Sequence, residues 1–119
     1  MGMKSTRAIG SSGERNAVSF LQRQGFAILD RNYTCNHGEV DVVAKDGDDL
    51  VFVEVKLRRS VRFGSPEESV TPAKQELIRR TAEGYIQEKK LNNIRCRFDV
   101  VAITVDKGVK KFVHYKNAF

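Results

Sequence analysis

The sequence of 119 residues has no tryptophan and only two prolines, two cysteines and two histidines. Cys35 and Cys96 lie far apart, and Cys35 with His37 supplies two ligands where a tetrahedral zinc site needs four. Without a disulfide or a structural metal, the fold must depend on a hydrophobic core, which one domain of this length can form. We therefore expect two free thiols in a reducing compartment.

Long apolar runs are also lacking. No segment approaches the roughly 18 consecutive apolar residues that a membrane-spanning helix needs. The N-terminal residues have no apolar stretch of the kind that a secretory signal contains. These absences predict a cytoplasmic protein with no membrane partner.

What the sequence has in excess is positive charge, with 21 Lys and Arg against 15 Asp and Glu and a net charge of +6. A basic balance favours a polyanionic partner such as nucleic acid. Part of this charge falls in one short segment with Arg58, Arg59 and Arg62. Because this segment follows the most apolar strand, we expect its arginines to meet phosphates.

Residues 1–12 are small, polar and rich in Gly and Ser, which predicts a flexible N-terminal tail before a single domain at residues 13–119. Periodicity and turn residues predict seven elements. They are a helix at 13–24, strands at 26–34, 39–45 and 50–57, a helix at 72–89, and strands at 97–105 and 110–115. Gly25 is expected to end the first helix, and Thr71 and Pro72 to begin the second.

The predicted fold class is α/β. Short turns between the first three strands predict an antiparallel meander. The second helix is long enough to let the fourth strand join the third in parallel. The result is a mixed central sheet flanked by two helices, with residues 58–70 as a basic loop.

Two charged residues, Glu54 and Lys56, interrupt the most apolar strand and point to the same side of the sheet. Charges within a buried strand pair with each other or bind something. A hairpin turn centred between Gly47 and Asp48 places Asp41 opposite Glu54, at a Cβ separation of roughly 4.5–5.5 Å. A turn centred one residue earlier shifts the pairing by two and keeps both acids on one face.

Adjacent buried carboxylates repel, so positive charge is expected between Asp41 and Glu54. Lys56 supplies one charge, and a hard dication with oxygen ligands, Mg²⁺ or Mn²⁺, would supply the rest. Glu14 lies on the apolar stripe of the first helix, where a carboxylate must be paired or bind a cation. The alternatives are a simple Glu54–Lys56 ion pair and, for Glu14, stabilisation by the helix dipole.

These residues resemble the motifs of the PD-(D/E)xK nuclease superfamily, in particular its YraN-like group of bacterial proteins, and are similar to archaeal Holliday-junction resolvases. The matching motifs, which span most of the chain, are Gly13-Glu14, Gly38-Glu39-Val40-Asp41, Phe52-Val53-Glu54-Val55-Lys56 and Arg97-Phe98-Asp99-Val100-Val101. One departure is that Val40 precedes Asp41, where the superfamily often has proline.

The resemblance implies a restriction-endonuclease-like αβββαβ core with a metal-dependent endonuclease site for DNA, including branched or junction DNA. In such a site Asp41, Glu54 and the Val55 carbonyl hold Mg²⁺ or Mn²⁺, and Lys56 is the catalytic lysine. Glu14 completes the metal shell directly or through water.

The second helix and the last strands add further candidates. Lys74 and Gln75 are expected near nucleic acid, or else are ordinary solvated residues. An Arg97–Asp99 pair, or a link from Asp99 to Lys56, is expected to be structural. The last strand can pair with a second copy, which makes a homodimer an expectation.

Two alternatives to a nuclease remain open. One is a nuclease-fold protein that binds nucleic acid with a partner in DNA processing and cleaves little. The other is a structural ion-pair cluster in an unrelated domain. The presence of Asp41, Glu54 and Lys56 together favours the enzyme, because a non-cleaving binder would commonly have lost one of them.

Overall fold

The computed structural model describes the backbone of residues 4–58 and 70–119, and the side chains of residues 13–58 and 70–119. Within these ranges the chain forms two helices and five strands. They are α1 (Lys4–Arg23), β1 (Ala27–Cys35), β2 (Gly38–Asp46), β3 (Asp49–Arg58), α2 (Pro72–Glu88), β4 (Arg95–Asp106) and β5 (Val109–Tyr115). Their order along the chain is the predicted one.

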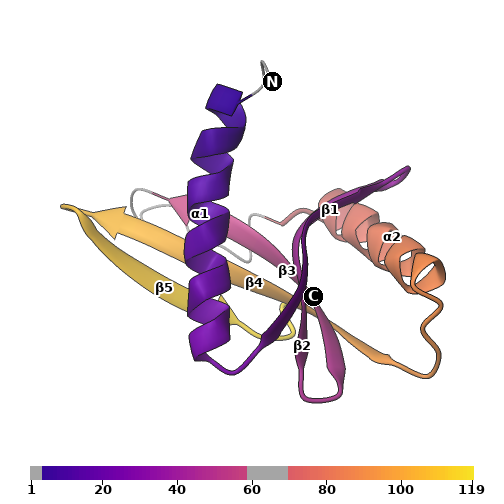
Figure 1. The fold of residues 1–119 in the computed structure, drawn as a ribbon. Helices are drawn as coiled ribbons and strands as arrows, with labels where there is room; N and C mark the ends of the chain where they lie inside the picture. The colour runs from indigo at the N-terminus through magenta and orange to yellow at the C-terminus, as the bar shows by residue number, and fades with distance from the viewer. Residues whose placement is uncertain (1–3, 59–69) are drawn as a thin grey trace.

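The five strands form one sheet in the order β1-β2-β3-β4-β5. The first three strands make an antiparallel meander, β3 and β4 are parallel, and β5 returns antiparallel to β4. Both the predicted meander and the predicted parallel pair are confirmed. The chain between β3 and β4 includes α2, which lies across the sheet from α1 (Figure 1).

The two helices cover opposite faces of the sheet because alternate strand residues are apolar on both sides. On the α1 face, Ala17 and Leu21 pack in one cluster with Val53. On the α2 face, Tyr85 packs in another cluster with Phe52. The central strand β3 is therefore buried on both faces, as its continuous apolar run predicts.

The first helix is longer than predicted. It begins at Lys4 and not near Gly13, so the predicted boundary between tail and domain falls inside α1. Once a helix is nucleated, each further residue gains a hydrogen bond at a modest entropic cost, which lets even Gly- and Ser-containing sequence continue it. The predicted start of this helix is therefore wrong, and the division into a tail and a domain stays a prediction.

The predicted end of α1 is confirmed at Gly25, which has a φ of 94°. The Gly25 N–H donates to Gln22 O and the Phe26 N–H donates to Leu21 O, each at 3.0 Å. This pair of bonds satisfies carbonyls that the last turn would otherwise leave free. It also places Phe26 (4% exposed) in the core beneath α1.

The predicted start of α2 is also confirmed. The Thr71 side chain accepts from the Lys74 N–H at 3.2 Å, and Pro72 occupies the first turn. The side-chain amide of Gln75 donates to Val70 O at 2.9 Å. These contacts fix the backbone position from which Lys74 extends.

Neither α1 nor α2, the helices of the described ranges, combines the length and the apolar composition needed to cross a membrane.

Candidate functional site

The β2–β3 hairpin has the predicted register. Asp46 faces Asp49, and the pairing continues residue by residue to Val42 and Val53, where it ends. Beyond this point β2 stays paired with β1, through Val40 and Tyr33. The two central strands therefore part at the step where Asp41 would face Glu54.

The Asp41 side chain lies across this opening. Its Oδ2 accepts a hydrogen bond from the Val55 N–H at 2.7 Å. The carboxylate thus takes the place of the backbone acceptor that Val55 lacks once the strands separate, because a buried N–H needs a partner. Asp41 is brought next to β3 without being a paired member of its ladder.

Glu54 lies beside this carboxylate, on the α2 face of β3, and is only 7% exposed. Two ammonium groups approach its Oε2 atom. Lys56 Nζ, from the same strand, and Lys74 Nζ, from α2, each lie 3.7 Å away. The predicted contact between Glu54 and Lys56 is confirmed, and the structure adds Lys74 to it.

The surroundings of Asp41 disfavour its ionised form. Burial and, after it, the charge of Glu54 raise the pKa of Asp41 from 3.8 to about 6. The Val55 N–H and the Lys74 ammonium act in the opposite direction without restoring the usual pKa. Positive charge is therefore still deficient around Asp41.

A hard divalent cation fits this deficit in charge and in donor type. Asp41 and Glu54 offer carboxylate oxygens, the ligands that Mg²⁺ and Mn²⁺ prefer. In residues 13–58 and 70–119, however, no group of three or more His, Cys, Asp or Glu side chains is placed to hold a metal. Asp41 and Glu54 are thus a two-carboxylate site in this structure.

Glu14 has a different neighbour. It is 5% exposed, and its Oε1 accepts from Arg31 Nε at 3.0 Å. Arg31 faces Val42 of β2, whose side chain packs in the α1 core. The expectation that a carboxylate on this stripe is paired is confirmed, and its role as a metal ligand stays a prediction.

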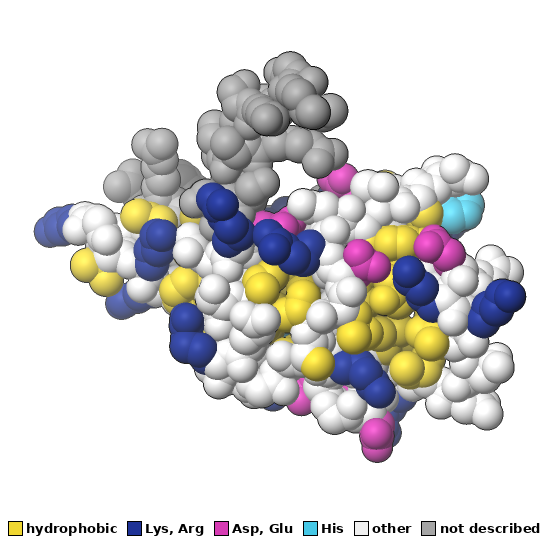
Figure 2. Space-filling model, in the orientation of Figure 1, with side chains coloured by type: hydrophobic (Ala, Val, Ile, Leu, Met, Phe, Trp, Pro, Cys, Tyr) yellow, Lys and Arg dark blue, Asp and Glu magenta, His cyan; other side chains and the backbone are white. Residues whose placement is uncertain are grey.

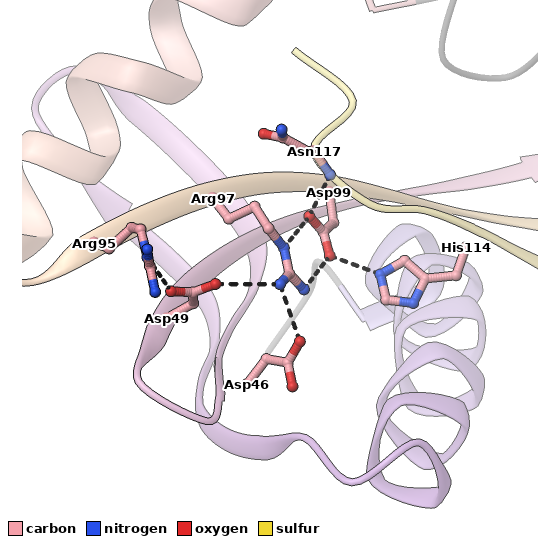
Figure 3. A network of polar contacts seen from close by, with 7 residues as sticks. All are labelled: Asp46, Asp49, Arg95, Arg97, Asp99, His114 and Asn117. Atoms are coloured by element: carbon pink, nitrogen blue, oxygen red, sulfur yellow. Dashed lines mark hydrogen bonds and ion pairs between the residues drawn. The ribbon is translucent and has the colours of Figure 1, made fainter.

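A second polar cluster occupies the α1 face of the sheet (Figure 3). Asp99 is fully buried and accepts from Arg97 Nε and Nη2, each at 2.9 Å. Its carboxylate also contacts His114 Nε2 at 2.7 Å and the Asn117 N–H at 3.0 Å. The predicted Arg97–Asp99 pair is confirmed. The alternative link to Lys56 is wrong, because Lys56 lies on the other face with Glu54.

The part played by His114 was not predicted. The signal for it was the β4–β5 turn, which sets Asp106 opposite Val109 and, counted back, Val101 opposite His114. This register brings the His114 ring within reach of Asp99, two residues from Val101 along β4.

The residues expected to contact nucleic acid have different surroundings, and their contact with nucleic acid stays a prediction. Arg58 ends β3 and is half-buried, whereas Arg59 and Arg62 lie outside the described residues. The amide of Gln75 is used within the chain, and the Lys74 ammonium lies at Glu54. On the face shown in Figure 2, the described Lys and Arg side chains are dispersed among acidic and apolar ones.

The fold and cluster define a mixed α/β domain with two carboxylates and two lysines where its central strands part. The model of the uncharacterised protein family UPF0102 matches residues 13–103. A UPF0102 protein of Caldicellulosiruptor saccharolyticus is 48% identical over 115 residues, 95% of this chain and 98% of that protein. A UPF0102 protein of Geotalea daltonii is 44% identical over 119 residues, 99% of this chain and 94% of that protein. The chain belongs to the UPF0102 family, which confirms the YraN-like resemblance.

Proposed function

We propose that this chain is an Mg²⁺- or Mn²⁺-dependent endonuclease with a restriction-endonuclease-like core, which hydrolyses phosphodiester bonds in DNA. The observation that carries the proposal is the pair Asp41 and Glu54 at the opening between β2 and β3. The pair is short of positive charge, as the raised pKa of Asp41 indicates. Perturbed acids of this kind gather at functional sites.

In this proposal Asp41 and Glu54 hold the cation together with the Val55 carbonyl, and Glu14 contributes through water. A bound divalent cation supplies Lewis-acid polarisation of the phosphodiester and activation of water. Lys56 is fixed on a central strand, 3.7 Å from Glu54. Its ammonium is positioned to stabilise negative charge that develops on the attacked phosphate.

The charge of the chain supports a polyanionic substrate, since its net charge is +6. Arg58, Arg59, Arg62, Lys74 and Gln75 are the proposed contacts to DNA. Branched or junction DNA suits the proposal, because β5 is an edge strand and can pair with a second copy to place two sites on one substrate.

The test is cleavage of linear, single-stranded, flap and four-way-junction DNA in Mg²⁺, Mn²⁺ or EDTA. We expect cleavage only with metal, and a loss of at least about 100-fold in Asp41→Asn and Lys56→Met, as expected when a group that stabilises the transition state is removed. The matched controls are the exposed residues Asp48→Asn and Lys111→Met, which keep the same changes in charge. Intact DNA in every reaction, or equal cleavage by the site variants, contradicts the proposal.

The second candidate is a nucleic-acid-binding protein that cleaves little and acts with a partner in DNA processing. The pairing of Glu14 with Arg31 favours it, because it leaves two carboxylates and no third ligand side chain among the described residues. If wild type shifts DNA on a native gel but cleaves it with neither Mg²⁺ nor Mn²⁺, the result would favour this second function.

A further inference from the structure

Lys74 and Lys56 reach the same oxygen of Glu54 from different elements. The Lys56 side chain is 28% exposed and extends from β3, two residues from Glu54. The Lys74 side chain is 42% exposed and extends from the first turn of α2. Two ammonium groups near one oxygen repel each other, so they are held there by the neighbouring acids.

The cluster is neutral when its four members are ionised, because Asp41 and Glu54 carry two negative charges and the lysines two positive ones. A dication at the carboxylates would leave the cluster with an excess of two positive charges. Both ammonium groups would then face a like charge at short range. One of the lysines must move away if the site is to hold the cation well.

Lys74 is the lysine that can leave at the lower cost. Its backbone is fixed by the Thr71 cap, but its side chain is the more exposed of the two and can extend the ammonium into solvent on its long stem. Lys74 is also the lysine whose charge acts on Asp41 as well as on Glu54. Its ammonium therefore serves both acids, which is what a bound cation would do.

We propose that Lys74 is an exchangeable counter-ion of the Asp41–Glu54 pair, which occupies the cation position in the metal-free protein and withdraws when a divalent cation binds. The inference rests on the proposed function and adds a role for Lys74 before DNA arrives. It makes Lys74 a competitor of the metal, whereas an ordinary structural ion pair would support the site.

The test is calorimetric titration of Mn²⁺ into wild type, Lys74→Met, Lys74→Arg and the control Lys111→Met, all without DNA. Removing the competing charge should tighten Mn²⁺ binding about fivefold in Lys74→Met. Lys74→Arg and Lys111→Met should stay within about twofold of wild type, since one keeps the local charge and the other removes a remote one. Tighter binding is a gain that a misfolded variant would not produce.

Melting curves supply the second measurement. In EDTA, Lys74→Met should melt below Lys111→Met, because the acids have lost a counter-ion. Mn²⁺ should then raise its melting temperature more than that of wild type.

The results distinguish a failure of the proposed lysine exchange from a failure of the proposed metal site. If wild type binds Mn²⁺ and Lys74→Met binds it equally or more weakly, the exchange is wrong and the metal site stands. If neither protein binds Mn²⁺, the metal site is wrong and the exchange fails with it. If binding is measurable only in Lys74→Met, the competition is supported.

Discussion

Each face of the sheet carries a carboxylate that is at least partly buried, and the two carboxylates differ in the direction of their pKa shift. Asp99 lies on the α1 face and Asp41 on the α2 face. Burial acts to raise the pKa of both. In Asp99, hydrogen bonds from His114, Arg97 and the Asn117 N–H outweigh burial and lower the pKa. In Asp41 the pKa rises to about 6.

The difference lies in how completely each carboxylate is provided with donors. Asp99 receives the planar fork of Arg97, and Arg97 itself reaches Asp46 at 3.0 Å (Figure 3). Asp41 receives one backbone N–H and has Glu54 as its neighbour. A complete network of donors stabilises the fold, whereas an incomplete one leaves a place for a ligand.

The largest change in stability is expected from Asp99→Asn. This change removes the buried charge partner of Arg97, whose side chain is only 15% exposed and keeps the less buried Asp46. Breaking a buried ion pair from one side should lower the free energy of unfolding by about 4 kcal/mol. Urea denaturation monitored by circular dichroism measures it.

The control for this variant is Glu76→Gln, which breaks the Glu76–Arg80 pair of 3.3 Å on the exposed side of α2 and should cost less than about 0.5 kcal/mol. Acidification should lower the stability of wild type in the same way as Asp99→Asn does. Because the pKa of Asp99 is lowered by folding, its contribution is complete above the ordinary value of 3.8 and is lost as the pH falls through the lower folded value. A loss equal to that of the control would show that the Asp99 network is not structural.

The next largest change in stability is expected on the α2 face, from the binding of Mn²⁺. If the proposed site binds Mn²⁺, the ion at about 100 times its dissociation constant should raise the free energy of unfolding by about 2.7 kcal/mol, because the unfolded chain would not hold the two carboxylates together. Glu54→Gln should abolish most of this gain, and Asp48→Asn should keep it. Thermal melts with and without Mn²⁺ measure both, and an equal gain in Glu54→Gln would move the metal away from this cluster.

A smaller effect, of opposite sign to that of Asp99→Asn, is expected from Asp41→Asn without metal. The difference between the ordinary pKa of 3.8 and the folded value of about 6 corresponds to about 3 kcal/mol at neutral pH. Partial exposure reduces the expected gain to about 1–2 kcal/mol. Asparagine keeps an oxygen for the Val55 N–H while removing the charge that repels Glu54.

The sign of this gain depends on pH. Well below the ordinary pKa of 3.8, Asp41 is protonated in both the folded and the unfolded state, so wild type and variant should be equally stable. As the pH rises through 6, the folded wild type must hold an unfavourable charge and the advantage of Asp41→Asn should develop fully. Urea denaturation in EDTA at about pH 3 and at about pH 7.5 measures the difference, and an Asp41→Asn protein less stable than wild type at the higher pH would contradict the account.

Much of the site could be predicted because it depends on local geometry. Counting from the Gly47 turn gave the β2–β3 register, and strand alternation put Glu54 and Lys56 on one face. The point where the ladder ends could not be predicted in this way. It depends on β1 and β4 holding β2 and β3 apart, which is a tertiary effect, and so the Asp41–Val55 hydrogen bond was not foreseen.

The same distinction explains Lys74. Helix periodicity could place it near the inward face of α2, but its contact with Glu54 depends on how α2 crosses the sheet. Nothing in local sequence specifies that crossing. The residues that the sequence analysis located least well are those whose partners come from other elements.

Glu14 was predicted in part from local sequence, since its helical stripe was predicted but its partner was not. Its substitution is expected to have the smallest effect of those considered. Glu14 is as buried as Glu54, yet Arg31, with which it pairs among the described side chains, has a side chain that is 46% exposed. If Glu14 acts on the metal through water, Glu14→Gln should weaken Mn²⁺ binding only about twofold, since a charge beyond direct contact is strongly screened. Arg31→Met, measured beside it by the same titration, should leave the affinity within that range. A loss of more than tenfold in Glu14→Gln would instead group Glu14 with Asp41 and Glu54 as a direct ligand, and its pairing with Arg31 would then belong to the metal-free protein alone.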